Sequence, residues 1–166
     1  MSAVLPHYRS GPANKQVATL VYGGQFVQPN TLTAGTTDLT VTLALSQSTH
    51  VLGVAATDAN VLTAQTGSPN SYGQPQIDIS LLTDYCSVYY GPIDIWCWYA
   101  GAVPEGGKLI IGTGNNGTVI AAGAGPASDQ VVGTCTQPGG VASAMLTQQI
   151  GGQGSAAYFL GRVRLV

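Results

Sequence analysis

The sequence predicts an all-β protein whose single small domain forms a barrel or a sandwich behind an extended N-terminal arm. Three observations carry this prediction. Apolar and polar residues alternate along several short segments, turn sequences rich in Gly and Pro separate them, and no segment keeps a 3.6-residue period over three helical turns. Many short strands joined by tight turns are typical of sandwiches and barrels.

The arm is predicted over residues 1–16, where Pro6, Gly11 and Pro12 interrupt any regular pattern. The single β domain is predicted over residues 17–166. Short helical turns are possible at 58–65 and 142–149. The expected strands lie at 17–22, 39–45, 51–56, 77–79, 86–90, 93–99, 108–111, 118–122, 131–135 and 159–165.

Charge is scarce in this chain. Charged residues make up 7% of it and hydrophobic residues 45%, whereas about 25% of an average soluble domain is charged. This balance excludes a disordered chain and indicates that partners cover part of the surface. The net charge is −2 with five basic residues in all, so we expect no direct contact with nucleic acid.

The N-terminal residues and the cysteines indicate the cellular compartment in which the protein is made. Residues 1–7 show no basic segment followed by an apolar one, and no run of about 18 apolar residues occurs, so neither a signal peptide nor a membrane helix is expected. Cys86, Cys97 and Cys135 are odd in number, which favours reduced thiols in a protein made in a cytoplasm. Cys86 and Cys97 could approach each other across neighbouring strands.

No pattern supports catalysis, and we expect neither an enzyme nor a bound cofactor or metal. Residues 112–117 match the letters of a GxGxxG motif, but a strand-like run follows where a dinucleotide site needs a helix. Asn116-Gly117 instead favours a hairpin turn. The cysteines form no CxxC pair, His7 and His50 stand alone, and no GxSxG motif occurs.

An aromatic cluster between residues 85 and 99 is the candidate contact surface. Trp96 and Trp98 share one face of a predicted strand whose other face carries isoleucines, so both rings are expected to point outward. Exposed Trp favours a contact with a partner protein or another subunit, and sugar stacking is the alternative. The predicted interface residues are Arg9 and Lys15 of the arm together with Trp96, Trp98 and Tyr99.

A weak internal repeat is also present. Residues 20–27 resemble residues 103–110 when Gly23-Gly24 is aligned with Gly106-Gly107, and residues 51–55 resemble residues 131–135. Each copy reads as a glycine turn, a strand, a hairpin and a returning strand. Two such units are expected to close one small barrel.

The order of these blocks resembles a family of phage proteins. The chain is similar to the small capsid proteins grouped with the lambda-type head decoration proteins and the related capsid-fibre proteins. The similarity covers about residues 17–166, with a longer segment at 60–100 than the family pattern has. The blocks that carry it are residues 23–27, 51–59, 103–109, 117–123, 131–135 and 161–166.

This resemblance implies a β-barrel or β-tulip-like subunit on the outer capsid surface of a tailed bacteriophage. It further implies a cement protein that binds the major capsid protein, stabilises the expanded shell and assembles as a homo-oligomer, with a trimer as the family pattern. The alternative function is a carbohydrate-binding module of a capsid or tail appendage. Synthesis in the host cytoplasm and incorporation into the virion follow from the same resemblance.

Overall fold

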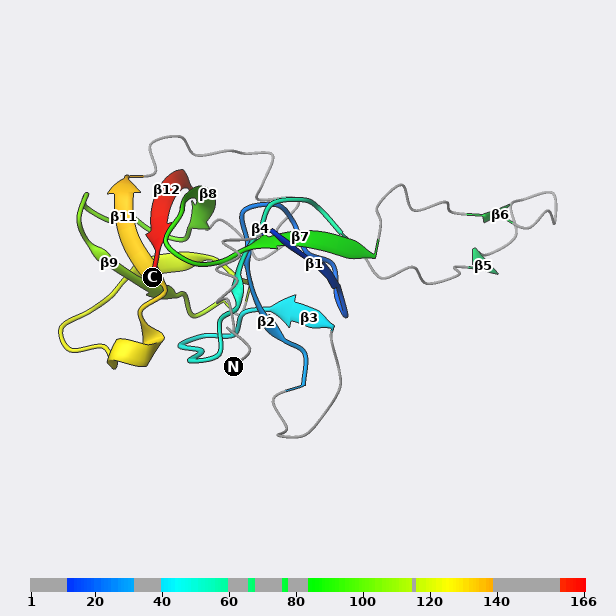
Figure 1. Ribbon diagram of the computed structural model, residues 1–166, viewed down its shortest axis with the longest axis horizontal. Helices are drawn as coiled ribbons and strands as arrows, with labels where there is room; N and C mark the ends of the chain where they lie inside the picture. The colour runs from blue at the N-terminus through cyan, green and yellow to red at the C-terminus, as the bar shows by residue number, and fades with distance from the viewer. Residues whose placement is uncertain are drawn as a thin grey trace, which may run out of the picture.

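The computed structural model describes residues 12–31, 40–59, 66–67, 76–77, 84–114, 116–138 and 159–166. Within these ranges the chain forms strands β1 to β12 and one 3-10 turn at Ser128–Gln130. Ten of the strands belong to two five-stranded sheets, an N-terminal sheet from residues 13–89 and a C-terminal sheet from residues 94–165 (Figure 1). The prediction of an all-β fold with a barrel is confirmed.

The N-terminal sheet has the strand order β1-β7-β4-β2-β3, and all its neighbouring strands are antiparallel. A parallel bridge from Val17 to Val41 joins the end of β1 to β3, so the sheet curls toward closure. Its strands are β1 (Ala13–Gln16), β2 (Phe26–Pro29), β3 (Val41–Leu43), β4 (Gly53–Ala55) and β7 (Tyr85–Tyr89).

The C-terminal sheet is a closed barrel in the order β10-β8-β12-β11-β9. The parallel pair Val119–Tyr99 closes it between β10 and β8. Its strands are β8 (Asp94–Tyr99), β9 (Lys108–Ile111), β10 (Val119–Ala121), β11 (Gly133–Gln137) and β12 (Phe159–Leu165).

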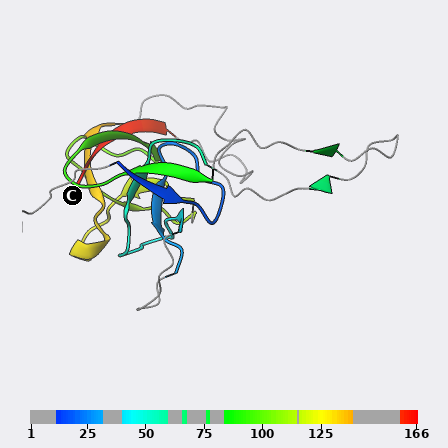
Figure 2. The same ribbon diagram turned by 45° about the vertical axis from the view of Figure 1, so that its right-hand side comes forward.

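A separate two-stranded pair consists of β5 (Thr66–Gly67) and β6 (Gln76–Ile77). Two views related by a 45° turn both place this pair well away from the two sheets (Figures 1 and 2).

The two sheets are copies of one unit, because their pairing registers correspond strand by strand. Val27 pairs with Leu43 and Gly53 in the first sheet, and Leu109 pairs with Ala121 and Gly133 in the second. The remaining strands correspond in the same way. The closing bridge Val17–Val41 is equivalent to the pair Tyr99–Val119. The pair Ala55–Val88 is equivalent to Cys135–Val163, and the pair Ala13–Val88 is equivalent to Ile95–Val163.

This correspondence corrects two details of the predicted repeat. The two units do not close one barrel, because the C-terminal unit closes on itself and the N-terminal unit forms a separate sheet that curls toward closure. The equivalent glycines are Gly24 and Gly106, one residue away from the alignment of the Gly-Gly pairs. Both adopt positive φ in the turn before the strand, and both amides bond to the returning strand, at Ala55 and Cys135. Only glycine adopts that conformation readily.

The predicted irregular arm is wrong for residues 13–16. These residues form strand β1, which pairs along its whole length with β7. Their side chains alternate between half-buried and exposed, the pattern of an edge strand. The Gly and Pro residues that suggested an arm come before this strand, at positions up to 12.

One face of the N-terminal sheet packs into the C-terminal barrel and joins the two units. Phe26, Ala44 and Val54 point away from their own core and belong to the core of the C-terminal barrel, together with Leu109 and Val163. The N-terminal core consists instead of Val17, Val21, Val27, Val41, Ala55, Ala59, Cys86 and Val88. The repeat equivalents of the three joining residues are Lys108, Ala122 and Thr134, none of them fully buried. These positions are apolar in the N-terminal copy, where they contact the C-terminal barrel, and accessible in the C-terminal copy, where they face water.

Hydrogen bonds reinforce this junction around the hairpin between β9 and β10. The amide of Phe26 donates to the carbonyl of Gly117 at 2.7 Å, and the buried side chain of Gln25 donates to the carbonyl of Asn116 at 2.8 Å. Residues 112–118 connect the antiparallel strands β9 and β10, so the hairpin prediction for Asn116-Gly117 is confirmed. No described helix is long and apolar enough to cross a membrane.

A glycine pair tests the junction. Gly117 has φ of 67°, and a Cβ there would collide with the backbone of Phe26; Gly106 has φ of 77° and open space around it. We expect Gly106→Ala to cost about 1 kcal/mol from backbone strain alone. Gly117→Ala should cost about 3 kcal/mol or more, because crowding adds to the strain. Urea unfolding of both variants measures this, and equal losses would contradict the tight approach of the two units.

Candidate functional site

The outer face of the β8–β12 pair carries a row of aromatic and charged side chains. The register places Asp94 opposite Arg164 and Trp96 opposite Arg162. The two pairs lie on one face because side chains two residues apart on a strand point the same way. This row, Asp94, Trp96, Arg162 and Arg164, is called the Trp96 face below.

Trp96 is 46% exposed, and the Arg162 guanidinium carbon lies 5.8 Å from the centre of its ring. This cation–π contact fixes the ring against the strand pair. The buried Nε–H of Arg162 has no hydrogen-bond partner among the described residues. The guanidinium of Arg162 is thus held by an aromatic ring and by no carboxylate in that part of the chain.

Arg164 and Asp94 form a two-pronged ion pair. Nε and one terminal nitrogen of Arg164 donate to the two carboxylate oxygens at 3.1 and 3.0 Å. These hydrogen bonds lower the pKa of Asp94 and raise the pKa of Arg164, and the nearby charge of Arg162 also lowers the former. Asp94 is therefore ionised at neutral pH. Two guanidinium groups face one carboxylate, which leaves the Trp96 face with net positive charge.

Trp98 departs from the prediction that both Trp rings point outward. Its side chain is on the outer face of β8, as expected, yet it is only 8% exposed. The turn at Gly23-Gly24 of the N-terminal unit covers it: the indole nitrogen donates to the Gly23 carbonyl at 2.8 Å, and a Cβ on Gly24 would collide with the ring. Trp98 thus belongs to the contact between the two barrels.

Tyr99 does not lie on the candidate surface, because its side chain is fully buried in the core of the C-terminal barrel. Its hydroxyl donates to the Arg162 carbonyl at 2.8 Å. Burial raises the pKa of Tyr99 and of Cys97 in the same core. The expectation that Tyr99 adds to an exposed contact surface is wrong; it stabilises the barrel from within.

The other predicted residues lie elsewhere. Lys15 is in β1 of the N-terminal sheet, opposite Cys86, and so on the other barrel from Trp96. Arg9 lies outside the described residues. Cys86 belongs to the N-terminal core and Cys97 to the C-terminal core, so the suggested approach of these two residues is not observed. All three cysteines are buried and free.

Beside the Trp96 face the surface is hollowed into a groove of about 590 Å³ between the two units. Trp96, Asp94 and Leu160 form one wall, and Tyr89 with the glycine turn at Gly23 forms the other. Most of its lining is apolar. Leu160 is itself one of the exposed large hydrophobic residues.

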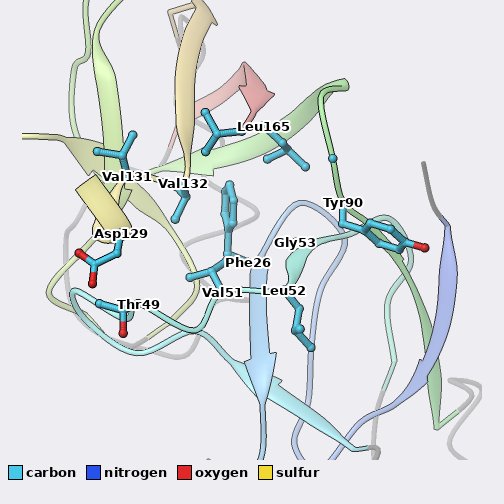
Figure 3. A pocket seen from close by; sticks show the side chains of 12 residues that line it. Phe26, Thr49, Val51, Leu52, Gly53, Tyr90, Asp129, Val131, Val132 and Leu165 are labelled. Atoms are coloured by element: carbon cyan, nitrogen blue, oxygen red, sulfur yellow. The ribbon is translucent and has the colours of Figure 1, made fainter. Parts of the chain in front are cut away.

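A second cavity of about 200 Å³ lies where the two cores meet (Figure 3). The ring of Phe26 points between the strands of the C-terminal barrel toward Val132 and Leu165, and Asp129 and Thr49 lie near the edge (Figure 3). This cavity is part of the packing between the units. Within the described residues no group of His, Cys, Asp and Glu could hold a metal ion.

The repeat provides an internal comparison for the Trp96 face. In the N-terminal sheet the positions equivalent to Trp96 and Arg162 are held by Asn14 and Ser87, which bond to each other at 3.1 Å. The same backbone therefore folds with small polar residues at these positions. The fold does not require an aromatic ring and a guanidinium there.

Sequence reasoning found Trp96 but missed Arg162, Arg164 and Asp94 as its partners. Alternation along 159–165 placed both arginines on one strand face, which was the available signal. The register that sets them opposite Trp96 and Asp94 depends on strand pairing across more than sixty residues, and periodicity carries no information on it.

Comparison with known proteins finds a similar fold in a solved structure. No family model matches the sequence, and no curated protein matches it. The fold is similar to that of the N base of head fiber gp8.5 from bacteriophage phi29, known from a crystal structure, with a TM-score of 0.51 and 10% sequence identity. The similarity covers 93% of this chain and 92% of the other. The two chains share a fold.

The two tryptophans should differ sharply in their effect on stability. Trp98→Ala should cost about 3–5 kcal/mol, because a large buried side chain and its hydrogen bond are lost between the barrels. Trp96→Ala should cost about 1 kcal/mol or less, since mainly an exposed cation–π contact disappears. Urea unfolding followed by far-UV circular dichroism measures both. Similar losses would contradict the assignment of Trp98 to the junction and Trp96 to the surface.

Proposed function

We propose that this protein is a structural protein of a phage virion, mounted on the outside of the head through the major capsid protein. The observation that carries the proposal is the shared fold with the N base of a phage head fiber over nearly the full length of both chains. The order of sequence blocks that resembles head decoration and capsid-fibre proteins supports it independently of the structure.

The low charge and the exposed apolar side chains of this chain support contact with other proteins. With 7% charged residues, the chain has few groups to keep a free monomer well solvated. Several large apolar side chains are exposed on both units, among them Leu45, Leu52, Tyr85 and Leu160. Specific association typically buries about 800 Å² on each partner, which such residues can supply.

Stabilisation of the shell would follow from mass action. A protein that binds the assembled, expanded shell but not its separated subunits shifts the equilibrium toward the shell. Assembly as a trimer would let several weak contacts act together, so that overall binding exceeds the affinity of any one contact. This role requires no catalytic group.

Binding to capsids tests the proposal. The purified protein is mixed with undecorated, expanded capsids of its parent phage, and co-sedimentation gives affinity and stoichiometry. We expect saturable binding at a ratio fixed by the lattice and a higher melting temperature of the capsid. A natively folded protein that fails to bind, or binds without saturation, would overturn the proposal. Analytical ultracentrifugation of the free protein tests the trimer separately.

A further inference from the structure

We propose that the Trp96 face binds an acidic carbohydrate, a sugar residue that carries a carboxylate. This activity goes beyond attachment to the capsid and does not depend on it. It would give the mounted protein a second, outward function: contact with carboxylated polysaccharides.

The aromatic part of the site is the exposed ring of Trp96. Arg162 covers one face of this ring from the neighbouring strand. A sugar ring has an apolar C–H face that stacks on aromatic rings, and a large rigid ring offers this contact at little entropic cost. The cation–π contact with the Arg162 guanidinium keeps the Trp96 ring in place before the sugar binds.

The charge of the site selects an acidic ligand. Arg162 and Arg164 are two of the five basic residues in the whole chain, and Asp94 is the single carboxylate bonded to them among the described residues. Arg164 is occupied by Asp94, whereas the buried Nε–H of Arg162 has no hydrogen-bond partner among the described residues. A guanidinium presents donors that match the two oxygens of a carboxylate. A carboxylated sugar can pair its carboxylate with the Arg162 guanidinium and stack its ring on Trp96.

The shape beside the ring suits a short oligosaccharide. The groove of about 590 Å³ runs along Trp96, Asp94 and Leu160 between the two barrels. Small-molecule sites commonly enclose about 300–1,000 Å³, with a mainly apolar lining and a few polar groups that fix orientation. The ionised Asp94 at its wall can accept hydrogen bonds from sugar hydroxyls.

The internal repeat shows that folding alone does not explain these residues. The equivalent positions in the N-terminal sheet, Asn14 and Ser87, form an ordinary polar surface pair. The exchange of a small polar pair for Trp96 and Arg162 in the second copy adds a ligand-binding pair to a backbone that is stable without it. Trp98 differs, because its contact with Gly23 gives it a structural role.

Calorimetric titration with two trisaccharides of one linkage tests the proposal: β-1,4-linked triglucuronate and its neutral counterpart, cellotriose. We expect the acidic trisaccharide to bind at least tenfold more tightly, and more weakly as salt rises. Arg162→Gln should abolish this preference, and Trp96→Ala should weaken binding of the acidic trisaccharide at least tenfold. Lys108→Gln removes the same charge from an exposed position of the same barrel and should leave binding unchanged.

A readout on the unmodified protein guards against variants that misfold. In NMR titrations with triglucuronate the indole N–H signal of Trp96 should shift, while that of the buried Trp98 should not. Equal affinity for the two sugars, no binding of triglucuronate, or full binding by folded Arg162→Gln would each overturn the proposal. Capsid co-sedimentation of the same variant separates the two functions, since Arg162→Gln should lose the preference for the acidic sugar and still bind capsids.

Discussion

The structure depends on the insertion of one residue of the N-terminal sheet into the core of the C-terminal barrel. Phe26 begins β2 of the N-terminal sheet, but its ring lies among the core residues of the C-terminal barrel, with Ala44 and Val54 beside it. Burial of such a ring and its neighbours contributes several kcal/mol, which a five-stranded unit of this size can hardly spare. Around it, Gly117 approaches the backbone of Phe26 and the turn at Gly23-Gly24 covers Trp98, so two sequence copies become one body.

Duplication explains how one backbone carries three kinds of surface. Positions that face inward are buried in both copies, as Val27 and Leu109 are. Positions that face the other barrel are apolar in one copy and accessible in the other, as Phe26 and Lys108 are. Positions on the outer face differ freely, and there the second copy carries Trp96 and Arg162. Such a division leaves the outer surface available for the proposed attachment to a phage head and the proposed recognition of a ligand.

Period-two alternation predicted most of the strands, because side-chain direction in a strand is a local property. It missed β1 and β2, and the strand expected at 17–22 is reduced to isolated bridges at Val17 and Val21. It also placed Ile95 of β8 on the core side and Trp96 outside. Alternation could not show what covers an outward side chain, so Trp98 was expected to be exposed, although the turn at Gly23 buries it. Likewise the repeat was visible in sequence, but whether its copies close one barrel or two depends on long-range pairing. The partners of Trp96 on β12 were hidden for the same reason.

The three buried cysteines offer the most direct test of a single body, since Cys86 lies in the N-terminal core and Cys97 and Cys135 lie in the C-terminal core. Thiol labelling in increasing urea, resolved by peptide mass spectrometry, follows both cores without any substitution. If the insertion of Phe26 couples the barrels, all three thiols should become reactive at one urea midpoint, which the fluorescence change of Trp98 should share. Labelling of Cys86 at clearly lower urea, with Cys97 and Cys135 still protected, would contradict the account.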